Sequence, residues 1–431
     1  MQTSDAELTG GSAMRVGTMR WIDRWVGPPL AAALVGLHRL WWRIAPPRRP
    51  ESTECIAFLG LSELGSAIIA DPAVRRAREL FPRAEIYYVI FASNRGCLDL
   101  LGTIDPQLVL TIRENYFHLF ALDSLAVVRT LRRLKTDIVI DLELFSRYTS
   151  LLSLLSDAPI RIGFHRFHGE GLYRGNHLTH PVQYNPHQHM AKNFLALVYA
   201  ATEAPGNAPH CKRRIEDAEI RLQSYQNRAA SAMLRSRLVH SFPVLAGASR
   251  WVILNANASH LIPLRRWPLE NFGQLAKRLL DDPDVAVLIT GAAEEHVDAE
   301  EIARMAPSDR LIDLTGLTRL DELPALYALC VMMLTNDSGP AHFAALTGLK
   351  TWVLFGPETP ALYGALNLNA EFIYKALACS PCVSAANHRR SPCTDNQCMK
   401  QITVEEVFAR MRAYLDALEQ KRLPERLRSG Q

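Results

Sequence analysis

One stretch of this 431-residue chain constrains its fold more than any other. Residues 330–364 read CVMMLTNDSGPAHFAALTGLKTWVLFGPETPALYG. Two short apolar runs, Cys330–Leu334 and Thr351–Phe355, have the length and bulk of buried strands. Between them lie the polar turn Asn336–Gly339 and a proline that suits the first turn of a helix. This order predicts one parallel βαβ unit, whose two turns lie at the edge where open α/β sheets bind ligands.

The two turns have the chemistry of an anion site. A helix that begins after the first turn directs free backbone N–H groups at whatever lies over Gly339. Gly339 and Gly356 lack the Cβ that would keep a phosphate from the backbone, and His342 can donate to a phosphate oxygen. The negative charge of the Asp337 carboxylate would repel a phosphate. We therefore expect Asp337 to orient His342, cap the turn or take a sugar hydroxyl. The alternative is a plain βα unit in which Asp337 and Ser338 only cap the helix.

A longer pattern runs from Asp337 to Pro360 and reads D-S-G-P-A-H-F-A-A-L-T-G-x-x-T-x-x-L-F-G-P-x-T-P. It resembles the donor-site signature of the heptosyltransferase family, glycosyltransferase family 9. Members of that family have two Rossmann-like domains in the GT-B arrangement and use nucleotide-activated sugars, ADP-heptose above all, without a catalytic metal. The resemblance therefore implies an α/β chain with two Rossmann-like domains that face each other across a cleft. The donor-binding residues that it implies here are Asp337, Ser338, Gly339, His342, Gly356 and Thr359.

The second domain supplies further candidate donor-binding residues. The segment Leu264–Pro268 resembles the family's K-x-W-P element, with Arg265 at the Lys position, and a cation there can pair with a diphosphate. The alternative is a helix preceded by charged turn residues. A predicted strand, Val285–Thr290, ends at Gly291, and Glu294 or Glu295 beyond it is placed to meet the nucleoside ribose or base; of the two, Glu295 is taken into the predicted set. Ser259 follows the domain's first strand and completes the predicted set.

The first domain opens with the predicted strand Cys55–Leu59 and a turn that resembles the family's S-x-L-G-D element. The Asp of that element is the family's proposed catalytic base, but Ser66 stands at its position here. An unassisted serine has no useful basicity near neutral pH. Glu63 in the same turn and Glu143 past a later apolar strand are therefore the other candidate catalytic residues. The alternatives are that Glu63 only caps the next helix and that Glu143 is a surface charge.

A polar, histidine-rich stretch, His165–Asn193, follows later in the first domain. We expect His165, Glu170 and Arg174 to line the acceptor site, with Glu170 as a third candidate base. A solvated loop is one alternative. A metal site is another, but the histidine spacings match no standard ligand pattern.

The eight cysteines bear on metal binding and on the cellular compartment. Four of them form the pattern C-x2-C-x10-C-x4-C, which could bind zinc, although its spacings are irregular. We therefore prefer free thiols or a pair of cysteines that pins the loop. No metal or other cofactor is expected. The other four are isolated, as in a reducing compartment. No cleavable signal peptide is visible, so we expect a cytoplasmic protein. The four patterned residues are Cys379, Cys382, Cys393 and Cys398.

The first 50 residues differ from the rest of the chain. They hold seven Arg and three acidic residues, whereas the remainder has 41 of each sign and thus no basic field for nucleic acid. An apolar helical face is predicted, with arginines opposite, but it is too short to span a bilayer. We expect an in-plane amphipathic helix on the inner membrane surface, or else a helix that packs on the protein's own core. The face comprises Leu34, Leu37, Trp41 and Ile44, and the arginines are Arg39 and Arg43.

The sequence therefore predicts three regions. Residues 1–50 are a disordered start, an amphipathic helix and a Pro/Arg linker; residues 51–225 are an acceptor domain and residues 226–431 a nucleotide-sugar donor domain. The resemblance implies an inverting, metal-independent transferase that moves a heptose-like sugar to a lipid-linked or envelope glycan, as in lipopolysaccharide core synthesis, at the inner face of the cytoplasmic membrane. The alternatives are an inactive nucleotide-binding scaffold of an envelope pathway and a nucleotide-sugar epimerase.

Overall fold

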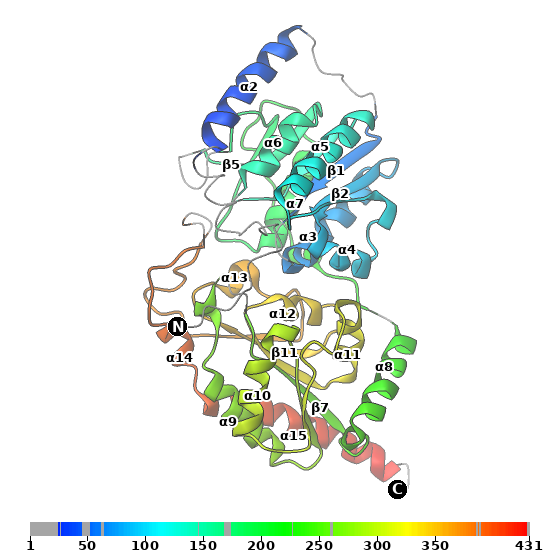
Figure 1. The fold of residues 1–431 in the computed structure, drawn as a ribbon, viewed down its shortest axis with the longest axis vertical. Helices are drawn as coiled ribbons and strands as arrows, with labels where there is room; N and C mark the ends of the chain where they lie inside the picture. Colours follow the sequence, from blue (N-terminus) through cyan, green and yellow to red (C-terminus); the bar gives the residue numbers. More distant parts are fainter. Residues whose placement is uncertain are drawn as a thin grey trace, which may run out of the picture. The chain divides into compact units, whose positions relative to one another are not determined.

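The computed structural model describes residues 25, 27–44, 52–61, 64–144, 146–167, 174–225, 227–258, 262–384, 387 and 389–428. Its contacts divide the chain into two units, Met1–Ile220 and Arg221–Gln431. Each unit is an α/β domain built on one six-stranded sheet (Figure 1). The sequence-based boundary, between residues 225 and 226, lies a few residues after this division.

The sheet of unit 1 has the strand order β3-β2-β1-β4-β5-β6, and all its pairings are parallel. β1 and β4 are neighbours, with Leu59 opposite Asp141, and the strand order reverses between them. Open α/β sheets bind ligands at such a switch point. The strands are β1 (Cys55–Leu59), β2 (Glu85–Phe91), β3 (Val109–Ile112), β4 (Ile138–Asp141), β5 (Ile160–His165) and β6 (His180–Gln183).

Helices cover both faces of this sheet, which is why β1 is buried along its whole length. The helix after β1 begins at Leu64, so Ser66 lies in its first turn. The α-helices are α2 (Gly27–Ile44), α3 (Leu64–Leu80), α4 (Arg95–Leu101), α5 (Phe117–Arg133), α6 (Arg147–Leu155) and α7 (Met190–Ala200). The short 3-10 helices are η1 (Ala92–Asn94), η2 (Pro106–Leu108) and η3 (Asp217–Ile220).

The N-terminal helix α2 packs with one face on unit 1. Trp42 Nε1 donates to Asp157 Oδ1 at 2.9 Å, and the Arg161 guanidinium lies 4.2 Å from the centre of the Trp42 ring. These contacts hold α2 against the rest of its own unit, and the membrane-surface helix stays a prediction. Within the described part of the chain, no helix is long and apolar enough to cross a membrane.

The sheet of unit 2 has the order β12-β11-β10-β7-β8-β9 and is also parallel. β7 and β10 are neighbours, with Asn255 opposite Thr335, and form its switch point. The predicted strand, helix and second strand within 330–364 are confirmed as β10, α12 and β11. The strands are β7 (Arg250–Asn255), β8 (Val285–Ile289), β9 (Leu311–Asp313), β10 (Met332–Asn336), β11 (Lys350–Phe355) and β12 (Ala370–Tyr374).

The helices of unit 2 bury this sheet and carry its loops. The α-helices are α8 (Arg228–Ser241), α9 (Leu269–Leu280), α10 (His296–Met305), α11 (Leu323–Leu329), α12 (Gly339–Ala344), α13 (Pro360–Tyr363), α14 (Gln397–Lys400) and α15 (Val404–Arg428). The 3-10 helices are η4 (Pro243–Ala246), η5 (Pro263–Arg265), η6 (Ala293–Glu295) and η7 (Leu320–Glu322).

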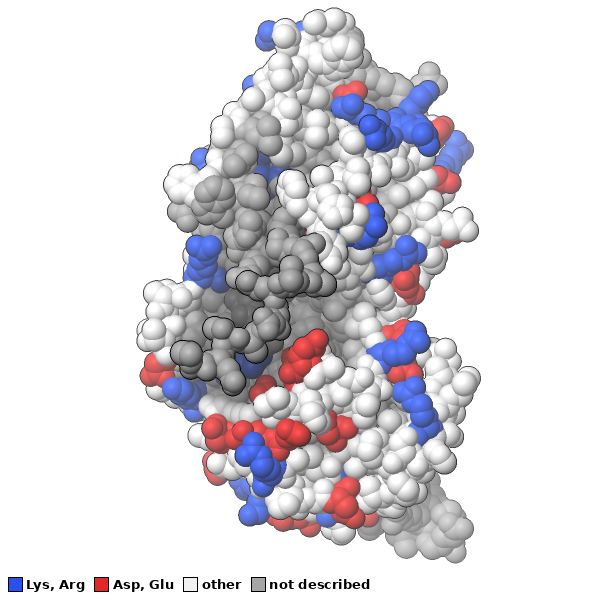
Figure 2. Space-filling model, in the orientation of Figure 1, with Lys and Arg blue, Asp and Glu red and all other residues white. Residues whose placement is uncertain are grey.

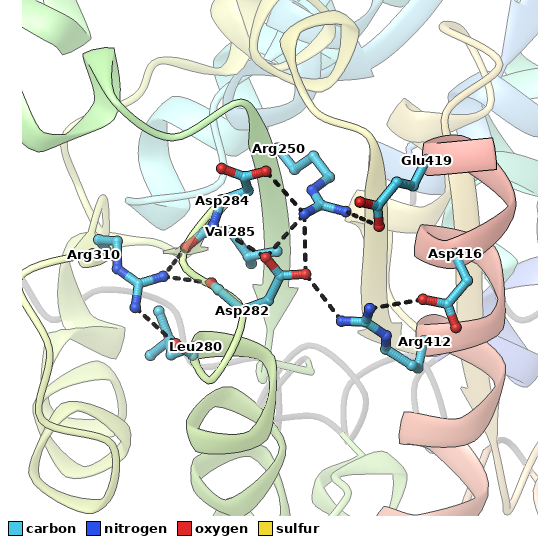
Figure 3. Close-up of polar contacts among 9 residues, drawn as sticks. All are labelled: Arg250, Leu280, Asp282, Asp284, Val285, Arg310, Arg412, Asp416 and Glu419. Carbon is cyan, nitrogen blue, oxygen red and sulfur yellow. Dashed lines mark hydrogen bonds and ion pairs between the residues drawn. The ribbon is translucent and has the colours of Figure 1, made fainter. Parts of the chain in front are cut away.

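A charged network fixes the C-terminal helix α15 at the edge of the sheet where β7 and β8 begin (Figure 3). Arg250 pairs with Asp282 at 2.9 Å and with Glu419 of α15 at 3.9 Å. Asp282 also accepts from Arg412 of α15 at 2.9 Å. Because this edge is opposite the carboxyl ends of the strands, the network stabilises the unit without reaching the candidate site.

Candidate donor and catalytic sites

Asn336, the last residue of β10, organises the candidate donor site of unit 2. Its side chain is fully buried. Its Nδ2 donates to the Ala256 carbonyl at 2.7 Å, and its Oδ1 accepts from the Trp267 N–H at 3.0 Å. One amide therefore holds the loop that follows β7 against the end of β10, at the switch point. Sequence reasoning gave Asn336 no role beyond a turn residue.

The η5 turn brings Arg265 to the same point. Arg265 Nη1 lies 3.5 Å from Asp337 Oδ2, and the two side chains are 9% and 6% exposed. Arg265 Nε is buried and has no hydrogen-bond partner among the residues that the structure describes. A charge-assisted hydrogen bond is ordinarily shorter than 3.5 Å, so the guanidinium keeps donor capacity for a bound anion. Asp337, predicted to orient His342, cap the turn or take a hydroxyl, lies beside Arg265.

The short helix α12 begins at Gly339 and contains His342, which is buried. Ser338 precedes it but makes no side-chain cap; its Oγ donates to the Asn336 carbonyl at 3.2 Å. A Cβ built on Gly339 would meet no atom within 4 Å. This helix contributes few aligned peptide dipoles, so most positive charge for an anion must come from Arg265, with His342 as a further possible hydrogen-bond donor.

Gly356 and Thr359 contribute to the packing of the second turn. A Cβ on Gly356 would lie 2.5 Å from Met399 Sδ and 2.9 Å from Cys398 Sγ. This glycine therefore makes room for the protein's own chain, which differs from the predicted approach of a phosphate. Thr359 precedes α13, and its Oγ1 accepts from the Ala361 N–H at 3.3 Å.

Gly291 and Glu295 lie together at the end of β8, beside a residue that sequence reasoning missed. A Cβ on Gly291 would lie 2.5 Å from Asn257 Nδ2 and 2.7 Å from Glu295 Oε2. Glu295 accepts from the Ala292 N–H at 2.7 Å. The buried Asn257 Oδ1 has no hydrogen-bond partner within the described residues, so it can accept from a ligand N–H or O–H. The predicted Ser259 lies outside the described residues.

The loop that contains the four patterned cysteines makes hydrogen bonds to two turns of the donor site, the turn at Pro357 and the η5 turn that contains Arg265. The N–H groups of Cys382 and Val383 each donate to the Pro357 carbonyl at 3.0 Å. Asn396 Nδ2 donates to the carbonyls of Leu264 at 3.0 Å and Arg266 at 3.1 Å. These carbonyls flank Arg265, so Asn396 fixes the turn that presents it.

The four patterned cysteines, Cys379, Cys382, Cys393 and Cys398, are free thiols. Among the described residues, which include all four, no group of three or more His, Cys, Asp or Glu side chains is arranged to hold a metal ion. Burial raises the pKa of the Cys398 thiol. The loop's contacts in this structure are therefore those of a positioning element.

Asn396→Ala is expected to weaken nucleoside-diphosphate binding about fivefold to tenfold, because two hydrogen bonds that fix the Arg265 turn are lost. Asn387 is the matched control: its Nδ2 donates to the Cys382 carbonyl at 2.7 Å in the same loop, away from that turn. Calorimetric titration and thermal melting of both variants separate the effects. Equal affinities for the two variants would contradict the positioning role of Asn396.

The candidate catalytic region of unit 1 also lies at a switch point. Glu143, just past β4, is buried, and its Oε1 accepts from the Leu61 N–H at 2.9 Å. Its own N–H donates to Asp141 Oδ1 at 3.1 Å. Glu143 is thus a buried residue that holds the loop leading into α3, which differs from the surface charge that the sequence left open. Ser66 is partly buried in α3, and Glu63 lies outside the described residues.

Arg174, predicted to bind the acceptor, braces this region from within. Its Nη2 donates to Asp141 and to Thr149 Oγ1, its Nη1 to the Glu143 carbonyl, and its Nε to the Ser146 carbonyl. The buried guanidinium is therefore committed to the protein's own oxygens. Burial raises the pKa of Asp141 to about 6, and the nearby Arg174 charge offsets only part of that rise.

Of the other two predicted acceptor residues, the structure describes only His165. His165 ends β5 and is half-buried, and burial with the neighbouring Arg166 lowers the pKa of its imidazole. A neutral imidazole can accept a hydrogen bond from a hydroxyl group. Glu170 lies outside the described residues.

Comparison with known proteins decides the family. The model of glycosyltransferase family 9 (heptosyltransferase) matches residues 124–391, which is more than half of the chain. The chain belongs to glycosyltransferase family 9. The match includes every predicted donor-binding residue, together with Glu143, His165 and Arg174, and leaves Glu63, Ser66 and Asn396 outside.

Individual members of family 9 show how far the likeness extends. Lipooligosaccharide heptosyltransferase 2 of Campylobacter jejuni is 28% identical over 168 residues, 38% of this chain and 51% of that protein. Lipopolysaccharide heptosyltransferase 2 of Escherichia coli is 33% identical over 114 residues, 26% of this chain and 32% of that protein. The chain thus spans about half or less of the length of these relatives.

The likeness to solved structures extends over both units. The ADP-heptose lipopolysaccharide heptosyltransferase II of E. coli superposes with a TM-score of 0.64 at 21% identity, covering 84% of this chain and 99% of that one. A family 9 glycosyltransferase of Veillonella parvula gives a TM-score of 0.57, also at 21% identity, over 75% of this chain and 86% of that one. These matches confirm the predicted GT-B fold class.

Proposed function

We propose that this protein transfers heptose, or a closely similar sugar, from a nucleotide-diphospho-sugar to a lipid-linked or envelope glycan, as in lipopolysaccharide core synthesis. The observation that carries the proposal is the buried Arg265–Asp337 pair at the switch point of a family 9 donor unit. The names of the relatives, which are lipooligosaccharide and lipopolysaccharide heptosyltransferases, support the choice of sugar and pathway.

The proposed reaction is a direct displacement. An acceptor hydroxyl attacks the anomeric carbon of the donor, the bond from that carbon to the diphosphate oxygen breaks, and the configuration at the carbon is inverted. A carboxylate takes the hydroxyl proton as the bond forms. Arg265, His342 and the first N–H groups of α12 stabilise the charge that develops on the leaving diphosphate, so the proposal requires no metal ion.

Within unit 1 we assign two roles to the carboxylates near β1. Glu63 is the proposed base, and Glu143 is a positioning residue that holds the Leu61 N–H, two residues before Glu63. The acceptor is expected in the same unit, near His165 and Glu170. We place the reaction at the inner face of the cytoplasmic membrane, where a lipid-linked acceptor would be presented.

The second candidate function is an inactive nucleotide-binding scaffold of an envelope pathway. Ser66 favours it, because serine stands where the family resemblance places the catalytic aspartate. A scaffold would keep the Arg265 site and bind nucleotide without turnover.

A transfer assay tests the proposal. The protein is incubated with ADP-heptose, or with UDP- or GDP-sugars, and a heptose-deficient core glycan; mass spectrometry detects the product. Melting with ADP, UDP or GDP shows which nucleotide the native state binds. We expect heptosylated glycan and stabilisation by one nucleotide. Stabilisation without product from any donor would favour the scaffold, and donor conversion without acceptor would indicate an epimerase.

A further inference from the structure

The outer face of α2 exposes large apolar side chains. Leu37 is 64% exposed, Leu40 55%, Trp41 55% and Ile44 73%. The opposite side of the helix is occupied by unit 1: Trp42 and His38 contact Asp157, and Arg39 donates to the Asn176 carbonyl at 2.9 Å. The helix is therefore held in one orientation that leaves its apolar face outward.

A second helix of unit 1, α5, also exposes large apolar side chains, and both helices contact α6. α6 packs against both α2 and α5, and the three labels lie together in Figure 1. On α5, Phe117 is 64% exposed, Leu122 59% and Leu125 44%. We call the exposed apolar residues of the two helices the α2/α5 face.

The charged residues of α2 and α5 themselves are mostly arginines. α2 contains no acidic residue, and the surface over it is mostly white in Figure 2. α5 has one acidic residue, Asp123, which pairs with Arg113 at 2.8 Å. The exposed cations of the two helices are Arg39, Arg43, Arg129, Arg132 and Arg133. Two of them also donate within unit 1, Arg39 to the Asn176 carbonyl and Arg132 to the Leu155 carbonyl.

We propose that the α2/α5 face docks on the surface of an anionic bilayer. Apolar and tryptophan side chains enter the interface between headgroups and acyl chains, while flanking arginines pair with anionic headgroups. A second copy of the chain suits this face less well, because a two-fold contact would bring like-charged arginines together. The inference names the surface behind the membrane placement in the proposed function, and it needs no catalytic residue.

The test uses the full chain and sedimentation with vesicles, without any sugar substrate. One set of vesicles contains phosphatidylethanolamine and phosphatidylglycerol, and another contains phosphatidylcholine alone. We expect the parent to bind the anionic vesicles and to release from them as salt rises. A triple variant, Leu37→Asn, Trp41→Ser and Ile44→Asn, should bind them at least about tenfold more weakly because less apolar area is buried.

A matched variant in unit 2 provides the comparison. Met233, Val297 and Leu368 are 74%, 67% and 86% exposed, and their replacement by Asn removes a similar amount of exposed apolar surface. This variant should bind vesicles like the parent. Phe117→Ser with Leu122→Asn should weaken binding by a smaller factor.

Several outcomes would contradict the proposal that the α2/α5 face docks on a bilayer. These are parent-like binding by the α2 variant, an equal loss in the unit 2 variant, and a parent dimer that only the α2 substitutions dissociate. Melting curves must show that the variants are folded. Transfer to a soluble core glycan is measured in parallel. Lost transfer with intact vesicle binding would count against the proposed function alone, and the reverse result would count against the docking face alone.

Discussion

Glu63→Gln is expected to lower the turnover number about 10²–10⁴-fold while nucleotide affinity stays nearly unchanged. The proposed base acts only while the acceptor hydroxyl loses its proton, so its removal affects the transition state and spares donor binding. Gln has nearly the shape of Glu but cannot take a proton. Initial rates at saturating donor, together with titration of the nucleoside diphosphate, separate the two effects.

Glu143 provides the internal comparison for this experiment. Gln at position 143 still offers an oxygen to the Leu61 N–H, so Glu143→Gln should keep the loop in place and change turnover less than about tenfold. Glu143→Ala removes that acceptor and should lower both turnover and melting temperature. If Glu143→Gln is as damaging as Glu63→Gln is expected to be, Glu143 is the base. An inactive parent together with an active Ser66→Asp variant would instead support the scaffold.

The parts of the fold that sequence reasoning predicted well depend on local pattern. The apolar runs that became β10 and β11 are short, bulky and bounded by turn residues, and Pro340 marks the helix between them. Because parallel strands need a crossover helix, this local order also fixes which ends of the strands carry the turns. Arg265 lies in the loop after β7, and Asp337 lies in the turn after β10. Because β7 and β10 are neighbours at the switch point, the two residues are close together.

Residues whose role depends on long-range contacts could not be found in the same way. Asn336 and Asn396 connect segments that are 69 or more residues apart in sequence. An asparagine at a turn is expected for local reasons, so nothing in the local pattern distinguishes a buried bridge. The surroundings of Arg174 depend on long-range contacts in the same way: a polar stretch predicts a ligand-facing loop, whereas the structure places this arginine inward, buried beside Asp141.

Arg265→Ala is expected to weaken nucleoside-diphosphate binding about 100- to 1000-fold. Part of the loss is the charge-assisted hydrogen bonding to the diphosphate, about 1.5–3 kcal/mol. The rest arises because the buried Asp337 carboxylate, no longer neighboured by this cation, repels the anionic ligand. Arg266→Ala is the matched control, since it removes the same charge one residue away, where the partner is Asp298 at 3.4 Å.

The double variant, Arg265→Ala with Asp337→Ala, isolates this repulsion. Removing Asp337 alone should change affinity by less than about threefold, because Arg265 still carries its charge to the diphosphate. Removing it from the Arg265→Ala background should recover about tenfold of the lost affinity, a coupling of about 1.4 kcal/mol between neighbouring residues. The four affinities are measured by calorimetry at a temperature where every variant is folded. Strictly additive losses would mean that the two residues contact different parts of the donor, and that Asp337 takes a sugar hydroxyl and does not repel the diphosphate.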